Sequence, residues 1–90
     1  MVERQIIVTN KLGIHARPAA RIVQTANQYK SDIRLITATD QADAKSILNV
    51  LMLCALVDTP VTIRATGADE KEAVEAVAAL FADKFGEEAN

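Results

Sequence analysis

Several residue types are scarce among the 90 residues of this chain, and each scarcity excludes a class of structure or site. There is one cysteine, Cys54, so the chain forms no internal disulfide, as expected for a reducing compartment. The one histidine, His15, and the one cysteine are too few for a zinc cluster. The three glycines lie far apart, so no glycine-rich loop can hold a phosphate. The sequence therefore predicts no metal and no cofactor.

Aromatic residues and long apolar runs are also missing. The chain has two Phe, one Tyr and no Trp, although half of its residues are hydrophobic, so the core must consist of Ala, Val, Ile and Leu. No run reaches the roughly 18 apolar residues of a membrane span, and no signal-peptide pattern opens the chain. We expect one soluble, cytoplasmic domain over 1–90 without membrane insertion.

The net charge of −2 conceals an asymmetry between the two halves of the chain. Residues 1–45 carry seven Lys and Arg against four Asp and Glu, whereas residues 46–90 carry three against eight. The basic excess lies in the half that contains His15, which weakly favours an anionic ligand or an acidic partner surface near this residue. It does not favour nucleic acid, which needs a basic patch and stacking aromatic residues.

The spacing of apolar residues predicts seven elements in the order β-α-β-β-α-β-α. Strands are expected over 2–9, 33–37, 39–44 and 61–65, and helices over 18–29, 47–53 and 69–85. Gly86 would end the last helix and leave a frayed tail over 87–90. The order indicates an α+β domain, in which a largely antiparallel sheet of four strands is covered on one face by the helices.

His15 is the most informative residue because it combines with Arg17 and Pro18 directly before a helix-like stretch. An imidazole nitrogen is a nucleophile, a guanidinium is a fork of donors, and a helix start offers free backbone N–H groups. A proline near the helix start is tolerated because its missing N–H has no intrahelical partner there. An isolated His-x-Arg-Pro is nevertheless more often an ordinary surface feature than a site.

The longer segment NKLGIHARPAA, residues 10–20, resembles the active-site segment of the HPr family, the histidine-containing phosphocarriers of the bacterial phosphoenolpyruvate-dependent phosphotransferase system. Residues 44–47 resemble the regulatory-serine segment of this family, and residues 65–70 resemble the turn into its last helix. Segments 9–13, 51–53 and 79–81 are similar to the nitrogen-related branch called NPr. The resemblance implies an open-faced sandwich of four strands and three helices, with the first helix starting one or two residues before Pro18, whereas the pre-proline rule places the boundary at Arg17.

The resemblance also implies a function. His15 would accept a phosphoryl group from Enzyme I and pass it to EIIA-type domains, so the protein would be a monomeric carrier rather than an enzyme. The Arg17 guanidinium and the backbone N–H groups of Ala16 and Arg17 would stabilise the phosphoryl charge.

The predicted helix over 47–53 is apolar nearly all round, and Ser46 is a suitable N-cap for it. Periodicity alone leaves open whether this helix is sunk in the core or exposes part of its surface. The resemblance favours a docking patch beside His15, with Val50 and Leu53 facing inward. The residues implied for the patch are Ala20, Ile47, Leu48, Leu51 and Met52. Ser46 resembles the serine modified by HPr kinase/phosphorylase.

Two alternatives remain, namely a regulatory binding module that acts through Ser46 and the middle helix, and an α+β domain without phosphate chemistry. Gln24 and Asn27 stand where sugar-system members often have lysines, which puts the choice of partners in doubt. Cys54 stands where many members have glycine, so we expect a left-handed backbone there and a small buried side chain.

Overall fold

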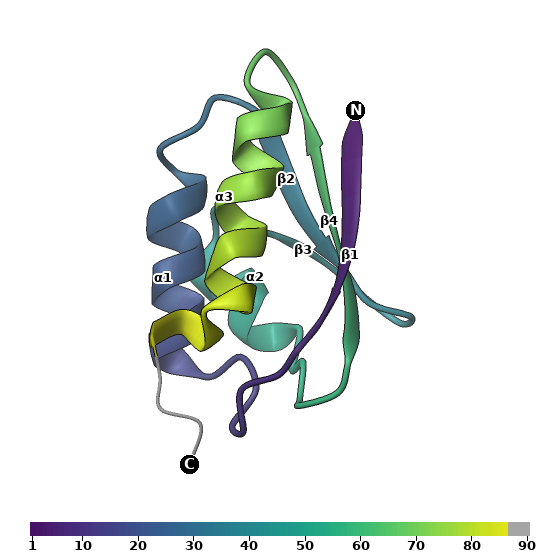
Figure 1. Cartoon of the computed structure of the whole chain (residues 1–90), viewed down its shortest axis with the longest axis vertical. Helices are drawn as coiled ribbons and strands as arrows, with labels where there is room; N and C mark the ends of the chain where they lie inside the picture. Colours follow the sequence, from purple (N-terminus) through teal and green to yellow (C-terminus); the bar gives the residue numbers. More distant parts are fainter. Residues whose placement is uncertain (87–90) are drawn as a thin grey trace.

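The computed structural model describes residues 1–86 and contains an open four-stranded sheet in the order β1-β4-β2-β3 (Figure 1). All three strand pairings are antiparallel. The strands are β1 (Val2–Ile7), β2 (Asp32–Ile36), β3 (Gln41–Asp43) and β4 (Pro60–Thr66). The helices are α1 (Ala16–Ala26), α2 (Ile47–Met52) and α3 (Glu70–Ala82), with a short 3₁₀ turn, η1 (Lys84–Gly86), after the last. The tail expected over 87–90 lies outside the described residues.

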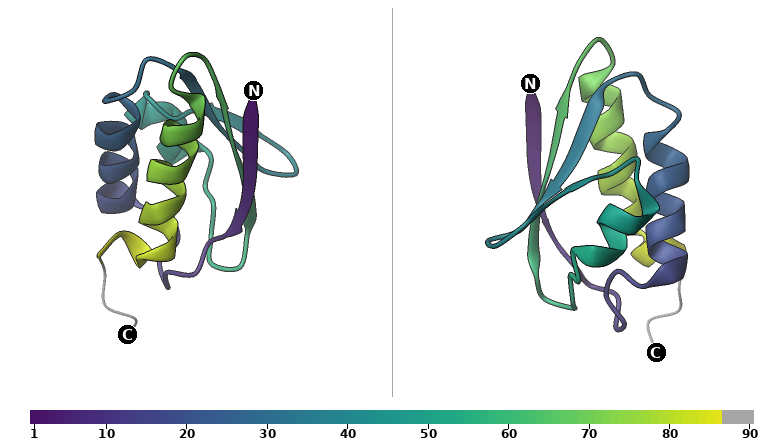
Figure 2. Two further views of the ribbon diagram at one scale, coloured as in Figure 1. Left: turned by 45° about the horizontal axis from the view of Figure 1, so that its top comes forward. Right: turned by 180° about the vertical axis from the view of Figure 1, so that it is seen from behind.

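The three helices cover one face of the sheet and leave the other face open (Figure 2). This arrangement follows from the alternation in the central strands, because Val61, Ile63 and Ala65 of β4 are completely buried on the helix side. Ile33 and Leu35 of β2 share this burial. The expected α+β architecture is confirmed.

Both strands at the edges of the sheet are shorter than the sequence suggests. The pairing of β1 with β4 ends at Ile7, and the next residue, Val8, bonds to the Asp58–Thr59 turn instead. The expected strand over 39–44 pairs only over Gln41–Asp43, because the preceding residues form a turn that is closed by the Thr37 N–H donating to the Asp40 carbonyl. Hydrogen bonds within turns therefore determine where β1 ends and where β3 begins.

Helix α1 starts two residues earlier than the pre-proline rule indicates, as the family resemblance implies. Ala16 and Arg17 are helical although Arg17 precedes a proline. The helix accepts Pro18 because the first backbone N–H that needs an acceptor is that of Ala19, which donates to the His15 carbonyl at 2.9 Å. The helix also ends before Tyr29, because the N–H groups of Gln28 and Tyr29 donate to the carbonyls three residues earlier, at 3.1 and 3.2 Å, and no longer four residues earlier.

The prediction that α3 extends to residue 85 is wrong, since the helix ends at Ala82. Lys84 and Phe85 both adopt positive φ angles, of 52° and 57°, within η1. This turn brings the buried Phe85 ring edge-on to Phe81, with the ring centroids 4.8 Å apart. Packing of Phe85 thus stops the helix before Gly86 is reached.

The other end of α3 is joined to the start of β2 through Asp69. The carboxylate of Asp69 accepts hydrogen bonds from the Ser31 hydroxyl at 2.5 Å and from the backbone N–H groups of Lys30 and Ser31, each at 2.9 Å. The hydroxyl of Ser31 above all, and then the Lys30 N–H, lower the pKa of Asp69 from 3.8 to about 2. The ionised carboxylate therefore stabilises the contact between these segments.

Candidate functional site

The loop that leads to His15 is clamped against the segment that follows α2. Gly13 has a φ of 67°, and a Cβ atom at this residue would lie 2.4 Å from the carbonyl oxygen of Ala55. The next residue, Ile14, donates its N–H to the same oxygen at 2.9 Å. Only glycine permits this close approach, so Gly13 fixes where the chain enters α1.

A small turn before Gly13 completes this loop. The Asn10 side chain is buried and donates through Nδ2 to the Gly13 carbonyl at 2.6 Å. The Gly13 N–H donates back to the Asn10 carbonyl at 3.1 Å, and the His15 N–H donates to the Gly13 carbonyl at 3.2 Å. These bonds hold the backbone immediately before the histidine.

His15 is the N-cap residue of α1 and is half-buried. The N–H groups of Ala16 and Arg17, the first two of the helix, have no carbonyl one turn earlier in the helix to which they can donate. The Arg17 side chain is exposed beside them. An imidazole, a guanidinium and a helix start therefore lie together at one end of the molecule, an arrangement able to stabilise an anion covalently attached to the ring.

Helix α2 exposes one side and buries the other. Val50 and Leu53 face inward as predicted, with 0% and 7% of their surface exposed, whereas Leu48 and Met52 are 63% and 69% exposed. Ile47 is also exposed. Leu51 differs from the other α2 residues implied for the patch, because it is half-buried and packs against the core. Ala20 is half-buried on α1, which runs beside α2 (Figure 2, right).

The structure adds exposed apolar residues that the sequence did not single out. Leu12 and Leu56 are 69% and 65% exposed. They lie on the two segments that Gly13 holds together, since the Cα of Leu56 is 2.9 Å from the Cβ position of Gly13. Exposed apolar side chains are therefore also present on the loop before His15 and on the segment after α2. Both residues are in irregular segments, so no periodicity in the sequence could reveal them.

The prediction of a buried Cys54 is wrong, because its side chain is exposed. The expected left-handed backbone is present, with a φ of 53°. This turn directs Leu53 into the core and leaves the next side chain outside, where Sγ donates to the Leu51 carbonyl at 3.7 Å. The sequence suggested burial because cysteine is usually buried, but the position within the turn decides the outcome.

Ser46 caps α2 as predicted, because its hydroxyl oxygen accepts the Asn49 N–H at 3.3 Å. Asn49 does not complete a capping box, since its side-chain oxygen accepts from the Asp43 N–H. The Asn27 side chain, just after α1, donates to the Lys45 carbonyl at 3.4 Å. Ser46 therefore lies near the far end of α1, on the order of 16 Å from His15 along a helix of 11 residues.

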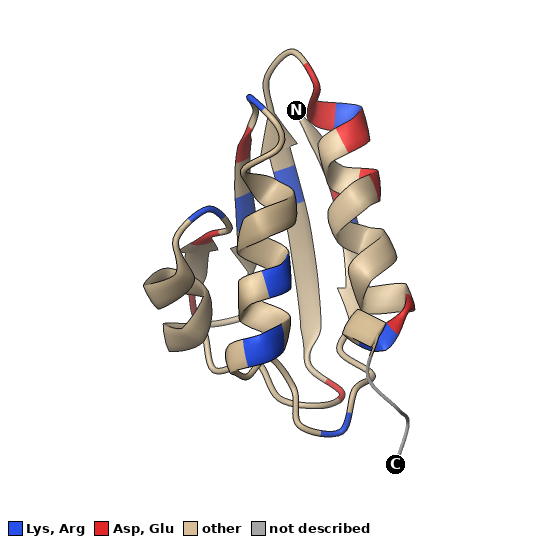
Figure 3. Cartoon of the chain, turned by 90° about the vertical axis from the view of Figure 1, so that its left-hand side faces the viewer, with Lys and Arg blue, Asp and Glu red and all other residues tan. Residues whose placement is uncertain are grey.

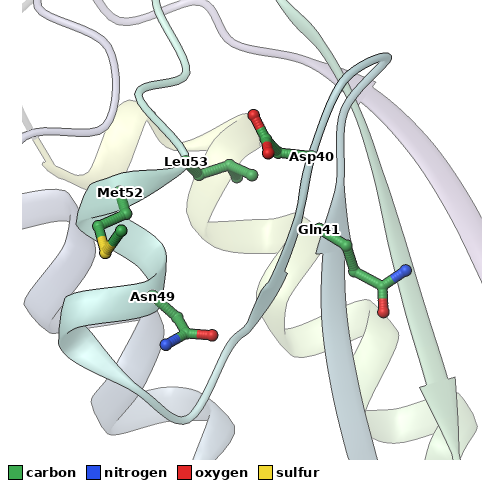
Figure 4. A pocket seen from close by; sticks show the side chains of 5 residues that line it. All are labelled: Asp40, Gln41, Asn49, Met52 and Leu53. Atoms are coloured by element: carbon green, nitrogen blue, oxygen red, sulfur yellow. The ribbon is translucent and has the colours of Figure 1, made fainter.

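A hollow lies between α2 and the hairpin that joins β2 to β3 (Figure 4). It is lined by Asp40, Gln41, Asn49, Met52 and Leu53. Met52 belongs both to this hollow and to the exposed side of α2, so the two surfaces are continuous. The hollow contains neither His15 nor Arg17.

Residues 1–86 contain no group of three or more His, Cys, Asp or Glu side chains that could hold a metal ion. Within the same part of the chain, no helix has the length and apolar character needed to cross a membrane.

Comparison with known proteins bears directly on this site. A family profile described as "PTS HPr component phosphorylation site" matches residues 2–83. The phosphocarrier protein HPr of Cupriavidus necator is 42% identical over 87 residues, which cover 97% of this chain and 98% of the relative. A crystal structure of HPr from Thermoanaerobacter tengcongensis superposes with a TM-score of 0.93 at 42% identity, covering 98% of this chain and 99% of the other.

A further crystal structure from T. tengcongensis, described as an HPr dimer, matches with a TM-score of 0.77 at 41% identity, covering 97% of this chain and 100% of that chain. The match in sequence and in fold extends over nearly the whole chain and includes the loop and helix start around His15. The chain therefore belongs to the HPr family of phosphocarrier proteins of the phosphotransferase system.

Proposed function

We propose that this protein accepts a phosphoryl group from Enzyme I on His15 and passes it to EIIA-type domains in the cytoplasm. The observation that carries the proposal is the position of His15 as N-cap of α1, beside two open backbone N–H groups and an exposed guanidinium. The chain belongs to a family of phosphocarriers, and this arrangement is suited to holding a phosphoryl group on the histidine.

The chemistry is a reversible transfer. The lone pair of an imidazole ring nitrogen forms a bond to phosphorus while the bond between phosphorus and the donor breaks and its electron pair returns to the donor. Arg17 and the N–H groups of Ala16 and Arg17 stabilise the charge on the phosphoryl oxygens, the helix start contributing about 0.3–1 kcal/mol. Because this stabilisation is modest, the phosphoryl group can still be transferred to the next protein.

The test is incubation with Enzyme I and phosphoenolpyruvate, followed by mass spectrometry of the intact chain and of its peptides. One acid-labile phosphoryl group on His15 is expected. His15→Ala should fold with the same unfolding midpoint and take up no phosphate, and labelling of this variant would refute the assignment. Arg17→Ala should slow transfer, whereas the control Arg34→Ala, on the sheet, should not.

The exposed side of α2 is proposed as the surface that docks both phosphoryl partners. Ile47, Leu48 and Met52 are exposed apolar side chains, and they lie on a helix that packs beside the one that carries His15. Ala20 and Leu51 are half-buried, so they would contribute less area to the contact. Burial of such side chains supplies most of the free energy of protein association.

Ser46 supports a second proposal, regulation by HPr kinase/phosphorylase. The specific observation is that its hydroxyl lies at the N-terminus of α2, next to the exposed Ile47 and Leu48. A phosphate there would interact favourably with the helix start yet place charge at the edge of the docking surface. Incubation with such a kinase and ATP, followed by peptide mapping, tests this proposal, and a lack of modification at Ser46 would refute it.

We also propose that the working form is a monomer, because dimerisation over α2 would cover the docking surface. The T. tengcongensis HPr dimer makes this worth measuring. Light scattering at micromolar concentration should give the mass of one chain, 9.7 kDa, and twice that mass would refute the proposal.

A further inference from the structure

Only two polar residues are buried in the part of the chain that the structure describes, Asn10 and Ser31, which are 3% and 1% exposed. Burial of a polar side chain is unfavourable unless the side chain forms hydrogen bonds. The Ser31 hydroxyl serves the fold, because it donates to the Asp69 carboxylate that joins α3 to β2. Asn10 instead belongs to the irregular loop between β1 and α1, directly before the site.

The Asn10 side chain holds one peptide group of this loop, the one between Gly13 and Ile14. It donates through Nδ2 to the Gly13 carbonyl at 2.6 Å. The N–H of the same peptide group, which belongs to Ile14, donates to the Ala55 carbonyl at 2.9 Å. Because a peptide group is planar, hydrogen bonds at its oxygen and at its nitrogen together fix the orientation of the plane. Asn10 supplies one of these two bonds.

The fixed peptide group also bonds to His15. The His15 N–H donates to the Gly13 carbonyl at 3.2 Å, so this oxygen accepts from both the Asn10 amide and the histidine backbone. A carbonyl oxygen has two lone pairs and can accept both bonds. His15 has an extended backbone, with φ of −97° and ψ of −165°, and its side chain does not cap α1. The position from which the imidazole extends therefore depends on the backbone that Asn10 holds.

Small errors in this position would affect phosphoryl transfer strongly. A ring nitrogen must face phosphorus while the N–H groups of Ala16 and Arg17 face the phosphoryl oxygens. A displacement of about 1 Å in a reacting group can lower a rate about 100-fold. Without the Asn10 amide, the turn would keep only the backbone bond from the Gly13 N–H to the Asn10 carbonyl, at 3.1 Å.

We propose that Asn10 is a positioning residue for phosphoryl transfer at His15. Its side-chain amide orients the peptide group between Gly13 and Ile14, so that the imidazole and the first two N–H groups of α1 converge on one phosphoryl group. The proposal rests on the proposed function of His15. Because Asn10 is buried, it touches neither the phosphoryl group nor the partner and acts only through the backbone.

Ser31 provides a matched control, because it is the other buried polar residue and lies far from His15. It follows the C-terminal end of α1, whereas Asn10 precedes the N-terminal end. The 11 residues of α1 separate these ends by on the order of 16 Å, and Figure 3 shows the helix extending along most of the molecule. Truncation of either side chain removes a buried hydrogen bond and should lower the unfolding free energy. Only truncation of Asn10 should also change the transfer step.

The experiment measures kcat and KM for phosphorylation of the full chain by Enzyme I, together with urea unfolding of each variant alone. Asn10→Ala should lower kcat by about 10- to 100-fold at an unchanged KM, because a misplaced histidine loses interactions made only in the transition state. Asn10→Ser keeps a weaker and shorter donor, so it should lower kcat less. Ser31→Ala should lower the urea midpoint and keep the wild-type kcat.

If Asn10→Ala and Asn10→Ser both keep the wild-type kcat, the amide does not position His15 and the proposal is wrong. It is equally wrong if Ser31→Ala slows transfer as much as Asn10→Ala does, since both side chains then act through stability alone. A raised KM at unchanged kcat in Asn10→Ala would mean that Asn10 supports the docking surface instead.

A failure of Asn10→Ala to fold leaves the decision to Asn10→Ser. A kcat below the wild type at an unchanged KM then supports the proposal, and the wild-type kcat overturns it. If the wild-type chain itself accepts no phosphoryl group, the proposed function has failed, and a positioning role for Asn10 fails with it.

Discussion

Truncation of Leu48 to alanine is the most direct test of the docking surface. Leu48 is 63% exposed, so most of its side chain is available for contact with a partner. Full burial of a leucine side chain is worth about 1.5–3 kcal/mol, and the exposed share of that value is about 1–2 kcal/mol. Leu48→Ala should therefore weaken binding of Enzyme I by about 5- to 30-fold.

The assay is isothermal titration of Enzyme I with each variant, combined with urea unfolding of each variant alone. A suitable control is Ile7→Ala, because Ile7 is 47% exposed but lies at the end of β1, paired with Pro60 rather than near α2. Leu48→Ala should keep the wild-type unfolding midpoint, since little of the side chain is buried in the free protein. Leu51 is less suitable, because its contact with the core would mix binding and stability.

Two results would refute the reasoning about Leu48. If Leu48→Ala binds Enzyme I as tightly as Ile7→Ala does, α2 is not the docking surface. If Leu48→Ala loses its cooperative unfolding transition, the Leu48 side chain stabilises the fold and is not available to bind a partner.

Three further predictions concern the supports of the site. Because folding lowers the pKa of Asp69 from 3.8 to about 2, the stabilising contact of Asp69 with Ser31 is complete above pH 4 and is lost as the pH falls through 2. Asp69→Asn should therefore flatten this part of the profile of unfolding free energy against pH. Gly13→Ala should lower the unfolding free energy by at least about 1–2 kcal/mol, from the backbone conformation alone, and should also slow phosphorylation; an unchanged urea midpoint would contradict the clash with Ala55. Ser46→Asp should slow phosphorylation of His15 at equal or slightly higher stability, and Enzyme I kinetics equal to the wild type would leave Ser46 as a plain N-cap.

Most elements of the fold could be predicted because their signals are local. The alternation of apolar residues in Val61–Ala65 and the helical spacing in α1 and α3 depend on neighbours within a few positions. The same is true of the Ser46 cap and of the placement of His15 at a helix start. The ends of the elements were predicted less accurately, because β1, β3 and α3 are all limited by a turn or by a packed side chain.

By itself the sequence determined the order of the elements, the face that each one buries and the conjunction of His15 with Arg17 at the start of α1. Only the tertiary structure decided that Gly13 closes on the Ala55 carbonyl, that Cys54 points outward and that Arg21 lies against Gly86. The physical reason is the range of the interactions. Capping and amphipathic spacing act between residues close in the chain, whereas these three features arise from turns and contacts between segments that only folding brings together.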